Sequence, residues 1–217
     1  MVKAITRQIG NWVVKERRPE GEGPHPLILL LHGWTGDEQS MWVFASRLPD
    51  YYWLAAPRGL YPAQMGGFNW VQARELAFPQ VKDFQPAVEA LLELLSPDNF
   101  PGAELDRFFL AGFSQGAALA YSLAFLHPQR VKALAGLSGF VPADSVQLIQ
   151  TQPLFGMHIF VAHGTQDALV PVEKARAGVI LLQKAGARVS YCEDDVGHKL
   201  SASCFGGFQS FFKAMEY

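Results

Sequence analysis

Residues 107–120 read Arg-Phe-Phe-Leu-Ala-Gly-Phe-Ser-Gln-Gly-Ala-Ala-Leu-Ala, in which a glycine-flanked serine separates two apolar runs. In this Gly-x-Ser-x-Gly pattern Ser114 occupies a tight turn between a strand and a helix. A glycine two residues before and after it leaves room for neighbouring backbone. We therefore predict a buried strand over 108–111, a nucleophilic serine at the turn and a buried helix over 117–126. The alternative is a serine in an ordinary glycine-rich turn.

The segments on both sides of this stretch predict strands that alternate with helices. Strands are expected near 9–14 and over 27–31, 51–56, 131–137, 158–162 and 189–192. Helices are expected over 37–48, 82–96, 171–185 and 201–215. This alternation favours one α/β domain over 1–217, with a mostly parallel sheet covered by helices on both faces. Functional groups in such sheets gather outside the carboxyl ends of the strands.

The composition is that of a globular protein with a large core. Hydrophobic residues make up 49% of the chain and charged residues 18%, and the net charge of −2 gives no reason to expect a nucleic-acid partner. No apolar run approaches the roughly 18 residues of a membrane span, and the N-terminus lacks a signal peptide's apolar core. A cytoplasmic location is expected. Cys192 and Cys204 match no metal-ligand spacing, and we expect them reduced, with a single disulfide as the alternative.

Two later strand ends carry a carboxylate and a histidine. Asp167 and His198 each follow a predicted strand, and the order Ser114, Asp167, His198 is that of a hydrolase triad on this kind of sheet. A histidine with a pKa of about 6.5 can take the serine proton at neutral pH. A carboxylate on the other ring nitrogen orients the ring and stabilises the imidazolium. We predict Ser114 as nucleophile, His198 as base and Asp167 as acid, with Asp144 as a rival acid.

Acyl transfer also needs donors for the oxyanion that forms on the attacked carbonyl. The backbone N–H of Gln115, directly after the serine, is one candidate, and the N–H of Trp34 is the second. His32 and His163 each precede a glycine at a strand end, and we interpret them as packing and hydrogen-bonding residues.

Several aromatic and apolar residues fall in loops expected at the same end of the sheet. Together with Trp34, a substrate pocket is predicted from Phe68, Trp70, Phe140 and Leu169. The alternative is that these residues simply pack on the core. The segment 61–70, with two adjacent glycines, is expected to form a flexible wall or a small lid.

These motifs together resemble the phospholipase/carboxylesterase family of small serine α/β-hydrolases, which includes bacterial carboxylesterases and acyl-protein thioesterases. The similar segments are Leu31-His32-Gly33 (oxyanion loop), 112–116 (nucleophile elbow), His163-Gly164 with Asp167 and Val170-Pro171 (acid loop), and Gly197-His198 (histidine loop). The chain departs from the family pattern at Trp34, where an aliphatic residue is usual, and at Ala117, where glycine is frequent. Trp34 is expected to narrow the acyl pocket.

The resemblance implies an α/β-hydrolase fold without a large cap domain. It implies hydrolysis of a small-molecule carboxylic ester through an acyl-enzyme, without metal or organic cofactor. Thioesterase or lysophospholipase activity is one alternative, and a small serine peptidase or C–C bond hydrolase using the same triad is another. A non-catalytic ligand-binding protein on the same fold is a third. The chain is expected to be a monomer or a homodimer, and the sequence does not fix the acyl-chain length.

Overall fold

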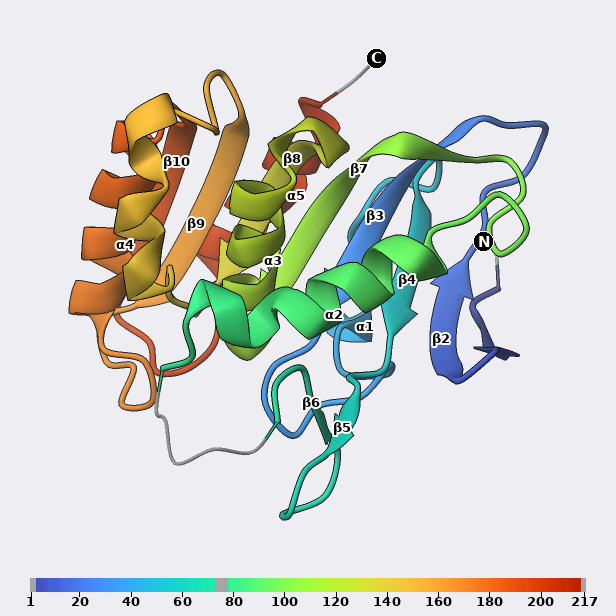
Figure 1. Cartoon of the computed structure of the whole chain (residues 1–217), viewed down its shortest axis with the longest axis horizontal. Coiled ribbons are helices and arrows are strands. Elements are labelled where there is room, and N and C mark those ends of the chain that lie inside the picture. The colour runs from blue at the N-terminus through green and yellow to red at the C-terminus, as the bar shows by residue number, and fades with distance from the viewer. Residues whose placement is uncertain (1–2, 73–77, 216–217) are drawn as a thin grey trace.

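The computed structural model describes residues 3–72 and 78–215, and its centre is an eight-stranded sheet (Figure 1). The strands are β1 (Ile5–Ile9), β2 (Trp12–Arg17), β3 (His25–Leu31), β4 (Trp53–Pro57), β7 (Ala103–Phe113), β8 (Val131–Leu137), β9 (His158–Gly164) and β10 (Arg188–Asp194). Their order across the sheet is β1-β2-β4-β3-β7-β8-β9-β10. From β4 to β10 all neighbours are parallel, whereas β1 and β2 are antiparallel strands at one edge.

Helices cover both faces of the sheet, as the alternating pattern predicts. One face carries α2 (Val81–Leu94), α3 (Gln115–Leu126) and α4 (Val172–Lys184), and the other carries α1 (Trp42–Ala45) and α5 (Ala202–Lys213) (Figure 1). Short 3₁₀ turns are η1 (Pro128–Arg130), η2 (Ala143–Gln147) and η3 (Ile149–Thr151). The remaining strands, β5 (Tyr61–Pro62) and β6 (Phe68–Asn69), form a separate hairpin. Within the described residues there is no large cap.

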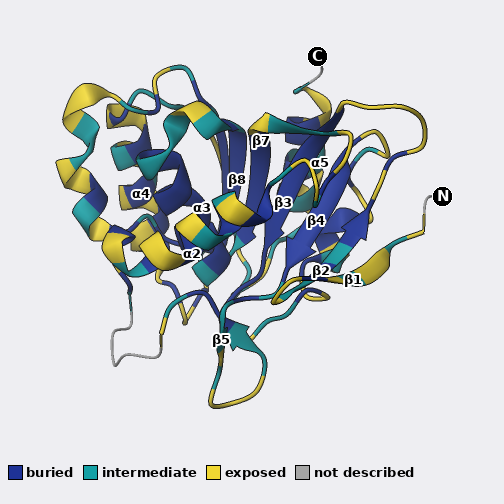
Figure 2. Cartoon of the chain, turned by 45° about the vertical axis from the view of Figure 1, so that its right-hand side comes forward, coloured by how far each residue is buried: buried dark blue, intermediate teal, exposed yellow. Residues whose placement is uncertain are grey.

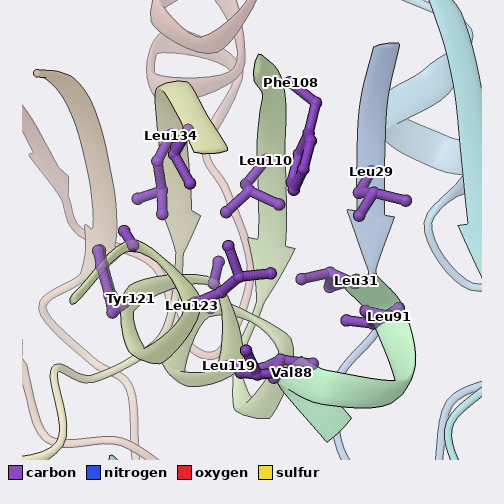
Figure 3. Packing of buried hydrophobic residues seen from close by; sticks show 14 of the residues in the cluster. Leu29, Leu31, Val88, Leu91, Phe108, Leu110, Leu119, Tyr121, Leu123 and Leu134 are labelled. Carbon is purple, nitrogen blue, oxygen red and sulfur yellow. The ribbon is translucent and has the colours of Figure 1, made fainter. Parts of the chain in front are cut away.

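The strand β3 shows why the central strands are continuously apolar. Leu29 and Leu31 belong to the core cluster beneath α2 and α3, which Figure 3 shows together with Val88. Ile28 and Leu30 belong to the cluster on the opposite face, beneath α1 and α5. Because successive side chains point to opposite faces and both faces are covered, every position of β3 is buried (Figure 2).

Two predicted elements differ in the structure. The single strand expected near 9–14 is the hairpin of β1 and β2, because Gly10 adopts a positive φ of 55° and turns the chain. The helix expected over 37–48 is reduced to the short α1. The Asp37 carboxylate accepts the backbone N–H groups of Gln39 and Ser40, and this local turn competes with helical hydrogen bonds.

The expectation that both cysteines are reduced is wrong for this structure, in which Cys192 and Cys204 form a disulfide. Cys192 lies in β10 and Cys204 in α5, and α5 packs back across the sheet as part of the second core cluster. The return of the helix places their Cα atoms 5.5 Å apart. Their spacing of 12 residues carries no signal of this pairing.

The chain reverses its direction across the sheet at β3. The strand β4 lies on one side of β3, and β7 lies on the other, followed outward by β8, β9 and β10. The carboxyl ends of β3 and β7 are therefore neighbours at a topological switch point, where α/β sheets form their binding crevices. The loop that begins at His32 and the turn at Ser114 both start there.

Candidate active site

Ser114 lies at the turn between β7 and α3, with φ 55° and ψ −116°. A Cβ atom on Gly112 would collide with the Gly116 carbonyl, and one on Gly116 would collide with the Leu31 carbonyl. The turn is therefore sterically closed to larger residues at both glycines. The Ser114 N–H donates to the carbonyl oxygen of Leu137 at 2.8 Å and ties the turn to the end of β8. Such a strained, over-determined residue is typical of functional sites.

Asp167 lies in the loop after β9, with its carboxylate fully buried. The oxygen Oδ1 accepts the backbone N–H groups of Leu169 and Val170, each at 2.9 Å. The oxygen Oδ2 lies 2.7 Å from His198 Nδ1 and 3.4 Å from His163 Nε2. These donors compensate the loss of water around the carboxylate, which would otherwise be strongly unfavourable.

His198 follows β10 and presents one ring nitrogen to Asp167. Because a carboxylate only accepts, Nδ1 carries the proton and Nε2 keeps a lone pair that can act as a base. The His198 side chain is 18% exposed. Its ring packs on that of Phe113, with 5.0 Å between centroids, and Phe113 directly precedes Ser114. The structure thus joins the predicted acid to the predicted base and places the base beside the elbow.

The acid loop and the histidine loop are attached to each other through backbone. Thr165 N–H donates to the Asp194 carbonyl at 2.9 Å, and Gln166 N–H donates to the Val196 carbonyl at 3.0 Å. A Cβ atom on Gly164 would collide with the Val196 carbonyl, so only glycine allows this approach. These contacts fix the relative position of Asp167 and His198 independently of their own hydrogen bond.

The predicted oxyanion donors lie on the two neighbouring strand ends. Gly33 packs directly on the elbow, since a Cβ atom there would lie 3.1 Å from Ser114 Cβ. Residues 33–36 form a turn in which Gly36 N–H donates to the Gly33 carbonyl at 3.0 Å. The Trp34 side chain is 60% exposed at this turn. Gln115 is the first residue of α3, where backbone N–H groups are free of intrahelical partners.

The segment 61–70 is the hairpin of β5 and β6, and its base is tied to both donor loops. Phe68 N–H donates to the Gly36 carbonyl at 2.8 Å. Trp70 N–H donates to the Gln115 side-chain oxygen at 2.9 Å, and the Trp70 indole donates to the His32 carbonyl at 2.8 Å. That the segment 61–70 moves as a lid stays a prediction.

The predicted pocket residues have different surroundings. Leu169 is 69% exposed, and the half-buried Phe68 lies under the Arg58 guanidinium. Phe140 is almost fully buried, and Trp70 is fully buried. Because Trp70 is fully buried and bonds the His32 carbonyl, its side chain has no exposed surface in this structure. Leu169 and Phe68, with Trp34, are the predicted pocket residues that expose appreciable side-chain surface.

The carboxylate of the rival acid Asp144 is engaged elsewhere, because it accepts the Val81 N–H at 3.0 Å at the start of α2.

The particular contacts of His32 could not be predicted from the sequence. Its ring nitrogens bond the backbone of Gly33 and of Gly59. The bond from the Gly59 N–H joins residues that lie 27 positions apart, and such a contact leaves no sequence pattern that would reveal it. In the described ranges, no group of three or more His, Cys, Asp or Glu residues is arranged to hold a metal, and no helix is long and apolar enough to cross a membrane.

Curated relatives share this chain's sequence over much of its length. Carboxylesterase SOBER1 of Arabidopsis thaliana is 28% identical over 192 residues, which cover 81% of this chain and 84% of that protein. Acyl-protein thioesterase 1 of Debaryomyces hansenii is 29% identical over 181 residues, covering 73% and 77%. A probable inactive carboxylesterase of Oryza sativa is 27% identical over 121 residues, which cover 55% of this chain and about half, 49%, of that protein.

Solved structures share the fold. A Bacillus cereus carboxylesterase superposes with a TM-score of 0.82 at 21% identity, covering 94% of this chain and 95% of that one. A Mesorhizobium loti carboxylesterase gives a TM-score of 0.80 at 24% identity, covering 96% and 98%. These likenesses establish an α/β-hydrolase fold. The phospholipase/carboxylesterase family model matches residues 13–215, from β2 to the end of α5, and with its elbow, acid loop and histidine loop the chain belongs to that family.

Proposed function

We propose that this protein is a serine hydrolase that cleaves carboxylic esters through an acyl-enzyme. Ser114 is the nucleophile, His198 the base and Asp167 the acid that orients it. The observation that carries this proposal is the 2.7 Å contact between His198 Nδ1 and the buried Asp167 carboxylate. The imidazole ring of His198 also packs on Phe113, the residue before Ser114. Membership of the phospholipase/carboxylesterase family supports the same chemistry.

In the first half of the reaction, Ser114 Oγ attacks the acyl carbonyl while His198 Nε2 takes its proton. The carbonyl oxygen becomes an oxyanion, which the backbone N–H groups of Gln115 and Trp34 stabilise. The tetrahedral intermediate expels the alcohol, which receives the proton from His198. In the second half, water attacks the acyl-enzyme, His198 takes its proton and returns it to Ser114, and the carboxylic acid leaves.

The substrate is a small acyl ester, and the open surroundings of the elbow support this. Trp34 and Leu169 are both largely exposed on the loops next to Ser114 and Asp167, where they offer apolar surface to an acyl or alcohol group. A thioester substrate is the second candidate, because relatives named acyl-protein thioesterase 1 match most of this chain. Ser114 would attack the acyl carbonyl of an ester and of a thioester in the same way, so the two substrate classes differ only in the leaving group, an alcohol or a thiol.

Turnover of p-nitrophenyl esters from acetate to palmitate tests the proposal, with matched acyl thioesters assayed in parallel. Ser114→Ala should abolish turnover, and a fluorophosphonate probe should label Ser114 alone by peptide mass spectrometry. Ser122→Ala is the matched control, because that buried hydroxyl in α3 donates to the Ala118 carbonyl of its own helix. Residual activity of Ser114→Ala within about tenfold of wild type would contradict the mechanism.

Turnover of the wild type is itself informative, because one rice relative carries the name of a probable inactive carboxylesterase. No ester or thioester turnover, combined with tight binding of a small ligand, would favour a non-catalytic ligand-binding protein. Hydrolysis of peptides in preference to esters would favour a serine peptidase, and cleavage of C–C bonds would favour a C–C bond hydrolase. Light scattering distinguishes the monomer from the homodimer, which both stay predictions.

The cytoplasmic location also stays a prediction. The Cys192–Cys204 disulfide is more usual in oxidising compartments than in the cytosol. Thiol alkylation of the protein in freshly lysed cells, followed by mass spectrometry, measures the fraction of these cysteines that is oxidised.

A further inference from the structure

His32 is buried at the start of the oxyanion loop, and both of its ring nitrogens bond backbone, one at Gly33 and one at Gly59 beyond the end of β4. The backbone N–H of Gly59 donates to Nε2 at 2.8 Å. The nitrogen Nδ1 lies 2.7 Å from the Gly33 carbonyl oxygen. A backbone N–H can only donate and a carbonyl can only accept, so Nε2 is unprotonated and Nδ1 carries the hydrogen. These two contacts select one neutral tautomer of the ring.

The Gly33 carbonyl receives two hydrogen bonds, one from His32 Nδ1 and one from the Gly36 N–H at 3.0 Å. This carbonyl belongs to the same peptide unit as the N–H of Trp34. A trans peptide is planar, and its C=O and N–H point in opposite directions. Holding the carbonyl toward His32 and Gly36 therefore holds the Trp34 N–H away from them. Among the described residues, that N–H has no hydrogen-bond partner.

We propose that His32 is a positioning residue of the oxyanion hole, because its neutral ring fixes the Gly33–Trp34 peptide plane and with it the direction of the Trp34 N–H. The inference rests on the proposed ester hydrolysis and adds a role for a side chain that contacts neither substrate nor Ser114 in that mechanism. Because Gly33 packs directly on Ser114, a rotation of this peptide plane would change the contacts of the nucleophile.

Further contacts hold the ring in place. The Trp70 indole donates to the His32 carbonyl at 2.8 Å. The ring centroids of Trp70 and His32 lie 4.9 Å apart. A Cβ atom on Gly59 would approach the imidazole at 3.2 Å and the Asn69 carbonyl at 2.7 Å, so the donor segment is closely packed as well. Burial is the main cause that lowers the pKa of His32, although Gly33, Asp37 and Glu38 act in the opposite direction and Arg58 acts with burial.

Three variants separate positioning from folding. His32→Leu removes both ring hydrogen bonds, whereas His32→Asn keeps a neutral N–H donor close to the place of Nδ1. His25→Leu is the control, because His25 is a buried histidine of the same β3 segment whose ring contacts the Gly21 carbonyl at the opposite end. Removing one oxyanion donor lowers kcat by about 10²–10³-fold, so misdirecting one should lower it by about 10–100-fold.

We expect His32→Leu to show this loss in kcat with KM within about threefold of wild type. A trifluoromethyl ketone, which forms an oxyanion adduct with Ser114, should bind more weakly by a similar factor. His32→Asn should recover most of the loss, and His25→Leu should keep the wild-type kcat. Two-bond ¹H–¹⁵N correlation spectra of the wild type should show His32 protonated at Nδ1 and not at Nε2.

Each contrary result has a separate meaning. An active wild type with His32→Leu equal to His25→Leu in kcat would overturn the positioning role and leave the proposed function standing. The role is also refuted if His32→Asn and His32→Leu lose activity equally and in proportion to their fall in melting temperature. A ring protonated only at Nε2 cannot donate from Nδ1 to the Gly33 carbonyl and would overturn the positioning role. A wild type without ester or thioester turnover would overturn the proposed function and the inference with it.

Discussion

Reduction of the Cys192–Cys204 disulfide should destabilise the fold without a comparable loss of activity. The bond closes a loop of 12 residues that contains the histidine loop. The loop-closure entropy of a cross-link of this length corresponds to about 3 kcal/mol of unfolding free energy. For a chain of this size that lowers the melting temperature by roughly 6–12 °C. Cys204 is buried in the core, and reduction breaks the S–S bond without removing any side chain from that core.

Activity should survive because the disulfide is not what aligns the base. His198 bonds the Asp167 carboxylate. The acid loop is also attached to the histidine loop by the backbone hydrogen bonds of Thr165 and Gln166. We therefore expect kcat of the reduced protein at 25 °C to stay within about twofold of the oxidised protein. Thermal inactivation, in contrast, should follow the lowered melting temperature.

Urea denaturation of the protein with and without a phosphine reductant measures the stability difference. The double variant Cys192→Ala, Cys204→Ala is the control, since the reductant has nothing to cleave in it. An unfolding free energy that changes by less than about 0.5 kcal/mol on full reduction would refute the loop-closure argument. A loss of kcat at 25 °C that matches the fraction reduced would instead show that the bond aligns His198.

Two further predictions follow from the buried polar groups. Asp167→Asn should lower kcat by about 10⁴-fold, because an amide can donate to His198 Nδ1 and favour the wrong tautomer, and steady-state kinetics with an unchanged circular dichroism spectrum measures it. His32 has a lowered pKa, so below about pH 6.5 the unfolded chain binds more protons than the folded one and the unfolding free energy falls as the pH falls. Urea titrations from about pH 7 to pH 5 should show a smaller decline for His32→Asn, and an equal decline would exclude His32 as the group responsible.

The elements that can be predicted well from sequence are those in which one local pattern decides the structure. The strand β3 is buried on both faces and reads as continuous apolar residues, so its existence and type are clear. The helix predicted over 37–48 is shorter in the structure, because the Asp37 carboxylate bonds nearby backbone instead. The cysteine pair could not be predicted from spacing, since it depends on where α5 returns to β10.

The candidate site divides in the same way. The contact between Asp167 and His198 could be predicted because strand ends in a parallel sheet meet at one edge and because the order of residues along the chain is informative. The burial of Trp70, a predicted pocket residue, could not be predicted, since it depends on contacts with the His32 carbonyl and the Gln115 side chain. Interactions between a side chain and a distant backbone group carry no periodicity.

The sheet order explains why the two halves of the site are supported differently. The elbow and the oxyanion loop follow β7 and β3, which are neighbours inside the sheet, and glycines at both allow direct backbone packing. His198 follows β10, which has only β9 beside it and lies at the edge of the sheet. An edge strand has half of the ladder contacts of an inner one and opens more readily. The backbone bonds from the acid loop hold His198 against Asp167 at this edge, whereas the disulfide between β10 and α5 adds stability to the fold around the histidine loop.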